Sequence, residues 1–397
     1  MIVAAALAAL ALRSQVAPIE IPFRIADDAL LVDATVNDSK VALVFDTGFG
    51  GSVLVDETVD IGPAAGTTVL RDFVGEFEAK TVKITSLKLG PVTIPSAGMM
   101  AIQEPLEGMT EGYNMHTDGL IGLNAIKNYV TEFDFEHQKL ILYPRSTDIT
   151  KRVPDGKKTF LAKLLPIGNT SMQMLVSVPT GRTMVMALDT GNSFYATTHR
   201  DVLERVGLWP NDKDPQFMKM SGIASGQVDS WNLQMPPLKV FGIPVENSVW
   251  SIIDLPSGSA ESDGTVGFEF LRNFNFTVDF ERRRIWFENF TGQTGNDPVA
   301  ETNLFGGYRD KTKKVEVWRV MPNSPAAKAG IKKGDEVISV DDKELAGATT
   351  FRKFETLMQG DLGTTVDVVI SRGGNLMRYD LKRAYLVNEA TGLAKIN

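Results

Sequence analysis

The chain carries one pair of short motifs twice, and this duplication constrains its fold more than any other feature. Two apolar residues followed by Asp-Thr-Gly occur at 44–48 and again at 187–191. An Asp-Gly-x-apolar-Gly motif lies downstream of each copy, at 118–122 and at 263–267. One Asp-Thr-Gly alone is typical of an ordinary turn. Two copies with matching downstream motifs at nearly equal spacing indicate an internal repeat.

The segments beyond these motifs extend the repeat. Residues 122–143 and 267–288 align without gaps and share Asp-Phe-Glu, followed by a charged turn and an alternating, strand-like end. We expect β-strands within 81–89 and 231–245, and one or two helical turns near 123–129 and 268–274.

The paired motifs resemble those of aspartic peptidases of the pepsin and retropepsin type, over about residues 20–290. The resemblance implies a mainly β, bilobal acid-protease fold in which each lobe supplies one Asp loop to a shared site. It places one β-barrel-like lobe at 19–150 and a homologous lobe at 151–290. The pattern is closer to the minimal retropepsin arrangement, fused as two lobes, than to pepsin itself.

The chemistry of such a site explains why two aspartates are needed. Two carboxylates about 3 Å apart cannot both ionise, so they share a proton. The charged carboxylate takes a proton from a water that attacks the peptide carbonyl, and the protonated one donates to the developing oxyanion. We expect Asp46 and Asp189 to form this dyad, with no metal or cofactor, and leave open which of them holds the proton.

The residues after each aspartate would support the dyad. By the resemblance, the threonines hydrogen-bond across the lobe junction, and the glycines let the backbone turn tightly; these four residues are Thr47, Gly48, Thr190 and Gly191. The family commonly has Ser or Ala at the next position, where this chain has Phe49 and Asn192. We expect Phe49 to remove a possible hydroxyl donor to Asp46 and to add bulk.

Two hairpins are candidates for substrate-covering flaps. Residues 71–79 and 221–231 have glycine at plausible hairpin positions. Mobile hairpins of this kind exclude water from a bound substrate.

Composition disfavours other chemistries. The chain has no cysteine, which excludes disulfides and thiol nucleophiles. Its three histidines, His116, His137 and His199, do not have a His-x-x-x-His spacing, which disfavours a metallopeptidase. Gly191-Asn192-Ser193 resembles a serine-protease nucleophile loop, but Phe194 and Tyr195 replace the glycines that supply its oxyanion amides. A net charge of −8 without a basic cluster argues against a nucleic-acid partner.

The last ninety or so residues change in character. A polar, Gly- and Thr-rich linker is predicted at 291–303. The run Ser-Pro-Ala-Ala-Lys-Ala-Gly-Ile at 324–331, with Gly-Asp at 334–335, resembles bacterial PDZ domains. The resemblance implies an α+β domain over 304–390, with a short helix that starts at Ser324-Pro325 and ends at Gly330. We also expect strands at 315–320, 364–372 and 376–384 and an amphipathic helix near 349–359.

PDZ domains bind extended peptides by adding a strand to a sheet edge, and they often hold a C-terminal carboxylate on loop amides. The candidate loop here comprises Phe305, Gly306, Gly307 and Tyr308, which is not the usual Gly-Leu-Gly-Phe order. The alternative is a docking module whose groove is empty or occupied by the chain itself.

The N-terminus predicts export. Residues 1–12 are apolar, too short a run to span a bilayer, and Ala9-Leu10-Ala11 offers a small-x-small cleavage pattern. We interpret 1–18 as a signal segment of a periplasmic or secreted protein; the alternative is a short helix packed on the body. No later segment is apolar enough for a membrane helix.

Two functions follow. The first is an aspartic endopeptidase that acts on proteins or peptides and uses its PDZ domain to recruit substrate. The second is a non-catalytic, PDZ-bearing peptide-binding or scaffold protein that keeps a peptidase-like body.

Overall fold

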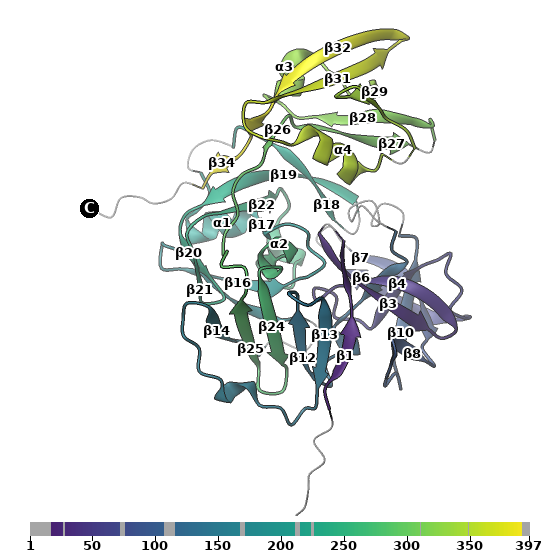
Figure 1. The fold of residues 1–397 in the computed structure, drawn as a ribbon, viewed down its shortest axis with the longest axis vertical. Helices are drawn as coiled ribbons and strands as arrows, with labels where there is room; N and C mark the ends of the chain where they lie inside the picture. Colours follow the sequence, from purple (N-terminus) through teal and green to yellow (C-terminus); the bar gives the residue numbers. More distant parts are fainter. Residues whose placement is uncertain are drawn as a thin grey trace, which may run out of the picture.

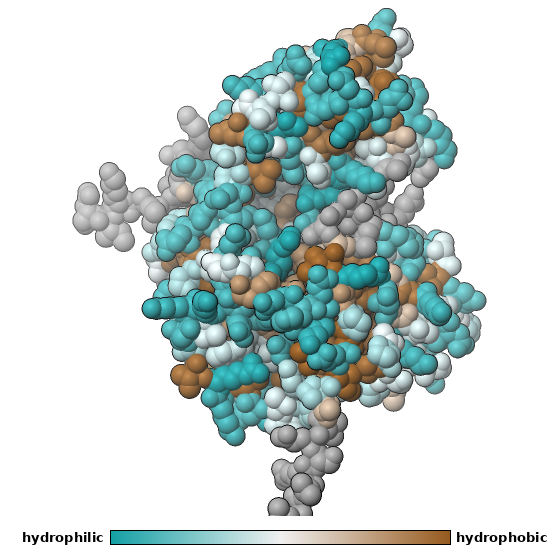
Figure 2. Space-filling model, viewed as in Figure 1, coloured by the Kyte–Doolittle hydropathy of each residue, from teal (hydrophilic) through white to brown (hydrophobic). Residues whose placement is uncertain are grey.

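The computed structural model describes residues 17–26, 28–71, 76–106, 116–166, 171–210, 215–223, 226–309, 311–347 and 349–390. Strands outnumber helices throughout (Figure 1), which confirms the predicted mainly β class. The predicted signal segment lies outside the described residues except for residues 17 and 18. Among the residues described, no helix is long and apolar enough to cross a membrane. The visible face of the molecule is largely hydrophilic, with scattered apolar patches (Figure 2).

Two large sheets repeat the same strand order. The first runs β6 (Ala64–Arg71), β7 (Glu76–Lys83), β10 (Met100–Glu104), β5 (Val53–Asp56), β11 (Gly119–Ile121), β4 (Ser39–Phe45), β3 (Ala29–Val36), β8 (Leu87–Leu89) and β9 (Val92–Ile94), with β2 (Arg24–Ala26) on β3. The second runs β18 (Lys219–Ile223), β19 (Gly226–Met235), β22 (Ser248–Ile253), β17 (Ala196–His199), β23 (Gly264–Val266), β16 (Thr183–Leu188), β15 (Gln173–Ser177), β20 (Leu238–Val240) and β21 (Ile243–Val245), with β34 (Asn388–Glu389) on β19. Strand for strand the two orders correspond, as a duplication requires.

A third, six-stranded sheet joins the two halves. Its order is β1 (Ile19–Pro22), β13 (Lys139–Tyr143), β12 (Val130–Asp134), β24 (Phe274–Asp279), β25 (Arg284–Asn289) and β14 (Thr159–Lys163), so each half contributes three strands. Where β12 meets β24, Phe133 and Phe276 pair in register and their rings stack with centroids 4.5 Å apart. The two halves therefore share one hydrophobic core.

Short helices complete the two halves. They are η2 (Leu123–Ala125), η3 (Ile149–Lys151), α1 (Arg200–Val206), η4 (Ser257–Ser259) and α2 (Phe268–Leu271). η2 and α2 follow the two Asp-Gly-x-apolar-Gly motifs, where one or two helical turns were predicted.

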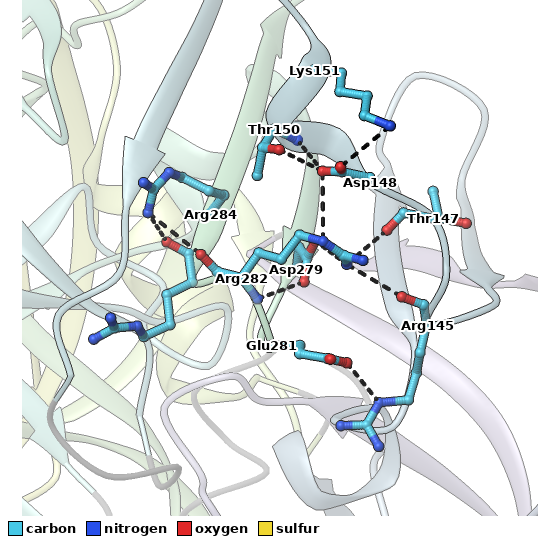
Figure 3. Close-up of polar contacts among 10 residues, drawn as sticks. Arg145, Thr147, Asp148, Thr150, Lys151, Asp279, Glu281, Arg282 and Arg284 are labelled. Atoms are coloured by element: carbon cyan, nitrogen blue, oxygen red, sulfur yellow. Dashed lines mark hydrogen bonds and ion pairs between the residues drawn. The ribbon is translucent and has the colours of Figure 1, made fainter.

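Arg282 connects the two halves of the body by hydrogen bonds and an ion pair at the end of the shared sheet (Figure 3). Arg282, in the turn between β24 and β25, donates to the backbone oxygens of Arg145 and Thr147 at 3.3 and 3.1 Å. It also pairs with the buried carboxylate of Asp279 at 3.0 Å. Arg282 thus ties the segment after β13 to the second half.

The C-terminal module has its own sheet and core. The sheet runs β27 (Leu304–Arg309), β28 (Lys314–Val320), β29 (Glu336–Val340), β31 (Thr365–Arg372) and β32 (Asn375–Lys382), with β30 (Lys343–Glu344) beside β29; its helices are α3 (Pro325–Ala329) and α4 (Phe351–Met358). α3 starts and ends as predicted, because the Ser324 hydroxyl accepts from the Ala327 amide and Gly330 adopts φ 83°.

Two expectations for this region differ from the structure. The end of the predicted linker is packed, because Thr302 and Asn303 are buried and β26 (Ala300–Glu301) pairs with β33 (Ala384–Tyr385). The predicted loop at 305–308 is instead part of strand β27. A Cβ at Gly306 would lie 2.5 Å from the Glu316 oxygen, so glycine here lets β27 approach β28 closely rather than form a loop.

The two predicted flaps correspond to hairpins in the structure. β6 pairs antiparallel with β7, and β18 pairs antiparallel with β19. The tips, residues 72–75 and 224–225, lie outside the described residues. The two hairpins occupy equivalent edges of the two large sheets.

We expect Arg282→Ala to lower the melting temperature clearly more than Arg145→Ala. The first change leaves the Asp279 carboxylate buried without its arginine partner. The second removes only an exposed ion pair to Glu281, in which both side chains are more than half exposed. Calorimetry on both variants measures the difference; equal melting temperatures would contradict this role for Arg282.

Candidate active site

Each Asp-Thr-Gly motif follows a buried central strand of its sheet. β4 ends at Phe45 and β16 ends at Leu188, so Asp46 and Asp189 leave their sheets at equivalent points. The Asp46 amide donates to the Ile121 oxygen, and the Asp189 amide donates to the Val266 oxygen, both at 2.9 Å. The two aspartates therefore begin their turns under the same backbone constraint.

The Asp-Gly-x-apolar-Gly motifs lie directly behind these turns. β11 runs parallel to β4 and antiparallel to β5, and β23 has the same relation to β16 and β17. A Cβ at Gly119 would lie 2.0 Å from the Leu54 oxygen, and one at Gly264 would lie 2.2 Å from the Thr197 oxygen. Glycine is needed at both positions because no side chain fits between the crossing strands.

The two threonines exchange hydrogen bonds across the junction of the halves. Thr47 Oγ1 accepts from the Thr190 amide at 2.9 Å and donates to the Leu188 oxygen at 2.9 Å. Thr190 Oγ1 accepts from the Thr47 amide at 3.1 Å and donates to the Phe45 oxygen at 2.5 Å. Both threonines are fully buried, so these four bonds fix one Asp loop against the other without competition from water.

The two carboxylates face each other across the glycines. A Cβ at Gly48 would lie 2.6–2.7 Å from the carboxylate atoms of Asp189, and one at Gly191 would lie 2.5–2.7 Å from those of Asp46. Oδ1 of Asp46 accepts from the amides of Gly48 and Phe49 at 2.7 and 3.1 Å. Oδ1 of Asp189 accepts from the amides of Gly191 and Asn192 at 2.9 and 3.2 Å.

The carboxylates hydrogen-bond to each other, and their pKa values are raised. Desolvation is the main cause for both groups. The pKa of Asp46 is raised well above its usual value, because the charge of Asp189 and the hydrogen bond donated to it add to desolvation. The same hydrogen bond lowers the pKa of Asp189, which accepts it. Raised pKa values on two adjacent carboxyl groups favour a pair that shares one proton, and both residues keep partial exposure to solvent.

One polar residue at the site was not found from the sequence. Thr265, in the second Asp-Gly motif, hydrogen-bonds to the Asp189 carboxylate and lowers its pKa. Its Oγ1 accepts from Asn192 Nδ2 at 2.8 Å, which orients the hydroxyl. The first copy has Leu120 at the equivalent position, so the shared pattern gave no signal for a polar group there.

Phe49 packs back onto its own half. Its ring occupies the space beside Gly51, where a Cβ would lie 2.2 Å from the ring. It contacts the buried apolar cluster formed by Ala29, Leu31, Val44, Leu54, Leu106 and Leu120. The residue after the Asp-Thr-Gly motif is therefore a packed aromatic ring in the first half and a hydrogen-bonded amide, Asn192, in the second.

The three histidines lie apart, each with its own partner. His116 pairs with Asp118, His137 pairs with Asp134, and His199 Nδ1 contacts the Leu255 oxygen. Within the described ranges, no three His, Cys, Asp or Glu side chains are grouped so that they could hold a metal ion.

Comparison with known proteins identifies the C-terminal module. Residues 296–382 match the family model of the PDZ domain, so the chain carries a PDZ domain there. A protein of Mesorhizobium japonicum named "Putative zinc metalloprotease mll0638" is 30% identical over 142 residues, which are 34% of this chain and 38% of that protein. The chain thus covers little more than a third of this relative. A solved structure of a photosystem II D1 C-terminal processing protease is 29% identical over 22% of this chain and 24% of its own, with a TM-score of 0.21.

We expect Thr47→Val to destabilise the protein. The change leaves the Thr190 amide and the Leu188 oxygen buried without partners, at about 1–3 kcal/mol for each. Thr47→Ser keeps the hydroxyl and serves as the matched control. Urea unfolding of the two variants measures the difference, and a valine variant as stable as the serine variant would show that the crossed bonds contribute little.

Proposed function

We propose that the chain is an aspartic endopeptidase with a pepsin- or retropepsin-like bilobal body and a PDZ domain. One observation carries the proposal: each half supplies an aspartate from an equivalent turn, and each carboxylate lies against the glycine of the opposite Asp-Thr-Gly motif. The matching strand orders of the two large sheets support the bilobal interpretation. Export of the protein remains part of this proposal.

The residues divide the reaction between them. The Asp189 carboxylate, whose charged form is favoured by Thr265 and two amides, accepts a proton from a water between the carboxylates. Protonated Asp46 donates a hydrogen bond to the peptide oxygen as it becomes an oxyanion. The proton taken by Asp189 later goes to the leaving amine, so the dyad ends with one proton, as it began.

The comparisons support the coarser part of the proposal. A PDZ domain implies peptide binding. A relative named as a protease supports a PDZ-bearing peptidase. That relative's name specifies zinc, whereas the geometry of this chain favours a pair of carboxylates, so the type of peptidase is open to a direct test.

We expect Asp46→Asn and Asp189→Asn each to abolish cleavage of a mixed peptide library between pH 3 and 8, with a loss of at least about 10²–10⁴-fold. Asparagine has nearly the shape of aspartate, so the fold should persist, and the melting temperature checks this. Asp33→Asn, at an exposed ion pair with Arg24, is the control and should remain active.

The same assay separates the alternatives. A chelator should leave the activity unchanged, whereas a zinc enzyme would lose it. Wild-type protein that binds peptides but cuts none at any pH would favour the non-catalytic peptide-binding alternative.

We expect Thr265→Val to move the acid limb of the pH–rate profile to higher pH. The hydroxyl stabilises charged Asp189, so its loss raises the pKa of Asp189, and the base is then protonated at a higher pH. Thr197→Val is the matched control, because Thr197 also accepts from Asn192, at 3.1 Å, but does not contribute to the pKa shift of Asp189. Acid limbs that coincide in both variants would contradict this role for Thr265.

A further inference from the structure

Five charged side chains connect the PDZ helix α4 to both halves of the body. Lys219 of β18 lies 3.0 Å from Glu301 and 3.8 Å from Glu355 of α4. Arg352 of α4 pairs with Glu355 at 2.7 Å and also with Asp28, in the turn between β2 and β3 of the first half. One helix of the PDZ domain therefore contacts a turn of the first half and a hairpin strand of the second.

These five charged side chains are largely shielded from solvent. The side chains of Lys219 and Glu301 are 8% and 5% exposed, and that of Glu355 is 13% exposed. Desolvation alone would lower the pKa of Lys219, but the charges of Glu301 and Glu355 outweigh it, so the ammonium stays charged. Buried, paired charges of this kind fix a relative position, because each loses its partner if the parts move.

An apolar contact reinforces the same interface. Phe305 of β27 is buried with Met220 of β18 and with Met321, and the Lys219 ammonium lies 5.9 Å from the centre of its ring. Further along β27, the Tyr308 amide donates to the Thr349 oxygen at 2.8 Å. Phe305 of this edge strand is therefore covered by the hairpin, whereas Tyr308 is bonded within the PDZ domain itself.

Other PDZ residues hold the backbone beside the hairpin. Asn303 Nδ2 donates to the Met218 oxygen at 3.0 Å, and Asn388 bonds to both the amide and the oxygen of Phe217 at 3.0 and 2.9 Å. β34 adds to β19 in parallel, and α4 and β27 lie next to β18 and β19 (Figure 1).

We propose that the PDZ domain is an intramolecular clamp whose partner is the β18–β19 hairpin, and that Arg352 is the positioning residue that also ties this hairpin to the β2–β3 turn. β18–β19 occupies in the second sheet the place that β6–β7 occupies in the first. In a peptidase these hairpins cover the substrate; that part of the inference rests on the proposed function. A peptide that adds to β27 must first displace the hairpin.

The test compares hydrogen exchange in Arg352→Gln and Arg372→Gln. Arg372 pairs with Asp335 inside the PDZ domain and is similarly exposed, 34% against 29%, but contacts neither half in this pairing. We expect Arg352→Gln to speed amide exchange in β18, β19 and the β2–β3 turn by on the order of tenfold. Arg372→Gln should leave these segments unchanged. Equal exchange in wild type and Arg352→Gln, or an equal rise in both variants, overturns the clamp.

Asp28→Asn removes the charge that pairs with Arg352 in the first half and serves if Arg352→Gln does not fold. It should speed exchange in the β2–β3 turn while β18–β19 stays protected, and an unchanged turn would count against the clamp. None of these measurements requires catalysis, so a wild-type protein that cleaves nothing would refute the proposed function and leave the clamp standing. If it does cleave peptides, Arg352→Gln should raise KM several-fold with a smaller change in kcat.

Discussion

The crossed hydrogen bonds between Thr47 and Thr190 are the interaction on which the candidate site depends. Each threonine side chain satisfies one amide and one carbonyl of the opposite half, in a position that water does not reach. Bonds of this kind are costly to leave unmade, so the two Asp loops have little freedom to separate. Two charged carboxylates repel each other at short distance. Here the surrounding backbone, fixed by the threonine bonds, holds them close together.

The duplication gives the site its symmetry, and two departures from symmetry give its aspartates different surroundings. Asn192 and Thr265 bring a hydroxyl to Asp189, whereas the first half has Phe49 and Leu120 at the equivalent positions, packed in an apolar cluster. Polar contact stabilises a charged carboxylate, and apolar contact favours the protonated form. A proton-sharing pair with two different roles benefits from such a difference, and differences at two positions of the repeat are enough to create it.

Most of the arrangement of the two Asp loops could be predicted from the sequence, because the motifs specify residue types at fixed spacings. Glycines that admit no side chain, and threonines that bond across a junction, are recognisable when a chain carries them twice. Thr265 was not predicted as a site residue because it aligns with Leu120 in the first copy. The site residues were identified from positions at which the two copies agree, and this position differs. The strand at 305–308 was missed because the PDZ resemblance assigned these residues to a carboxylate-binding loop, and only the partners Glu316 and Trp318 reveal why glycine is needed there. Phe49 packs against a cluster that includes residues distant in sequence, such as Leu106 and Leu120.

The position of the PDZ domain could not be inferred from any motif, because the charged residues that hold it come from four separate segments. Asp28, Lys219, Glu301 and Arg352 are each unremarkable in their own stretch of sequence. Buried ion pairs add little net stability compared with apolar packing, since desolvation offsets much of their attraction. What they add is specificity of arrangement, because a shifted helix α4 would leave buried charges unpaired. A domain known for binding separate peptides is here held by its edge strand and its helix against the chain that carries it, and under the proposed clamp an incoming peptide would have to replace the β18–β19 hairpin.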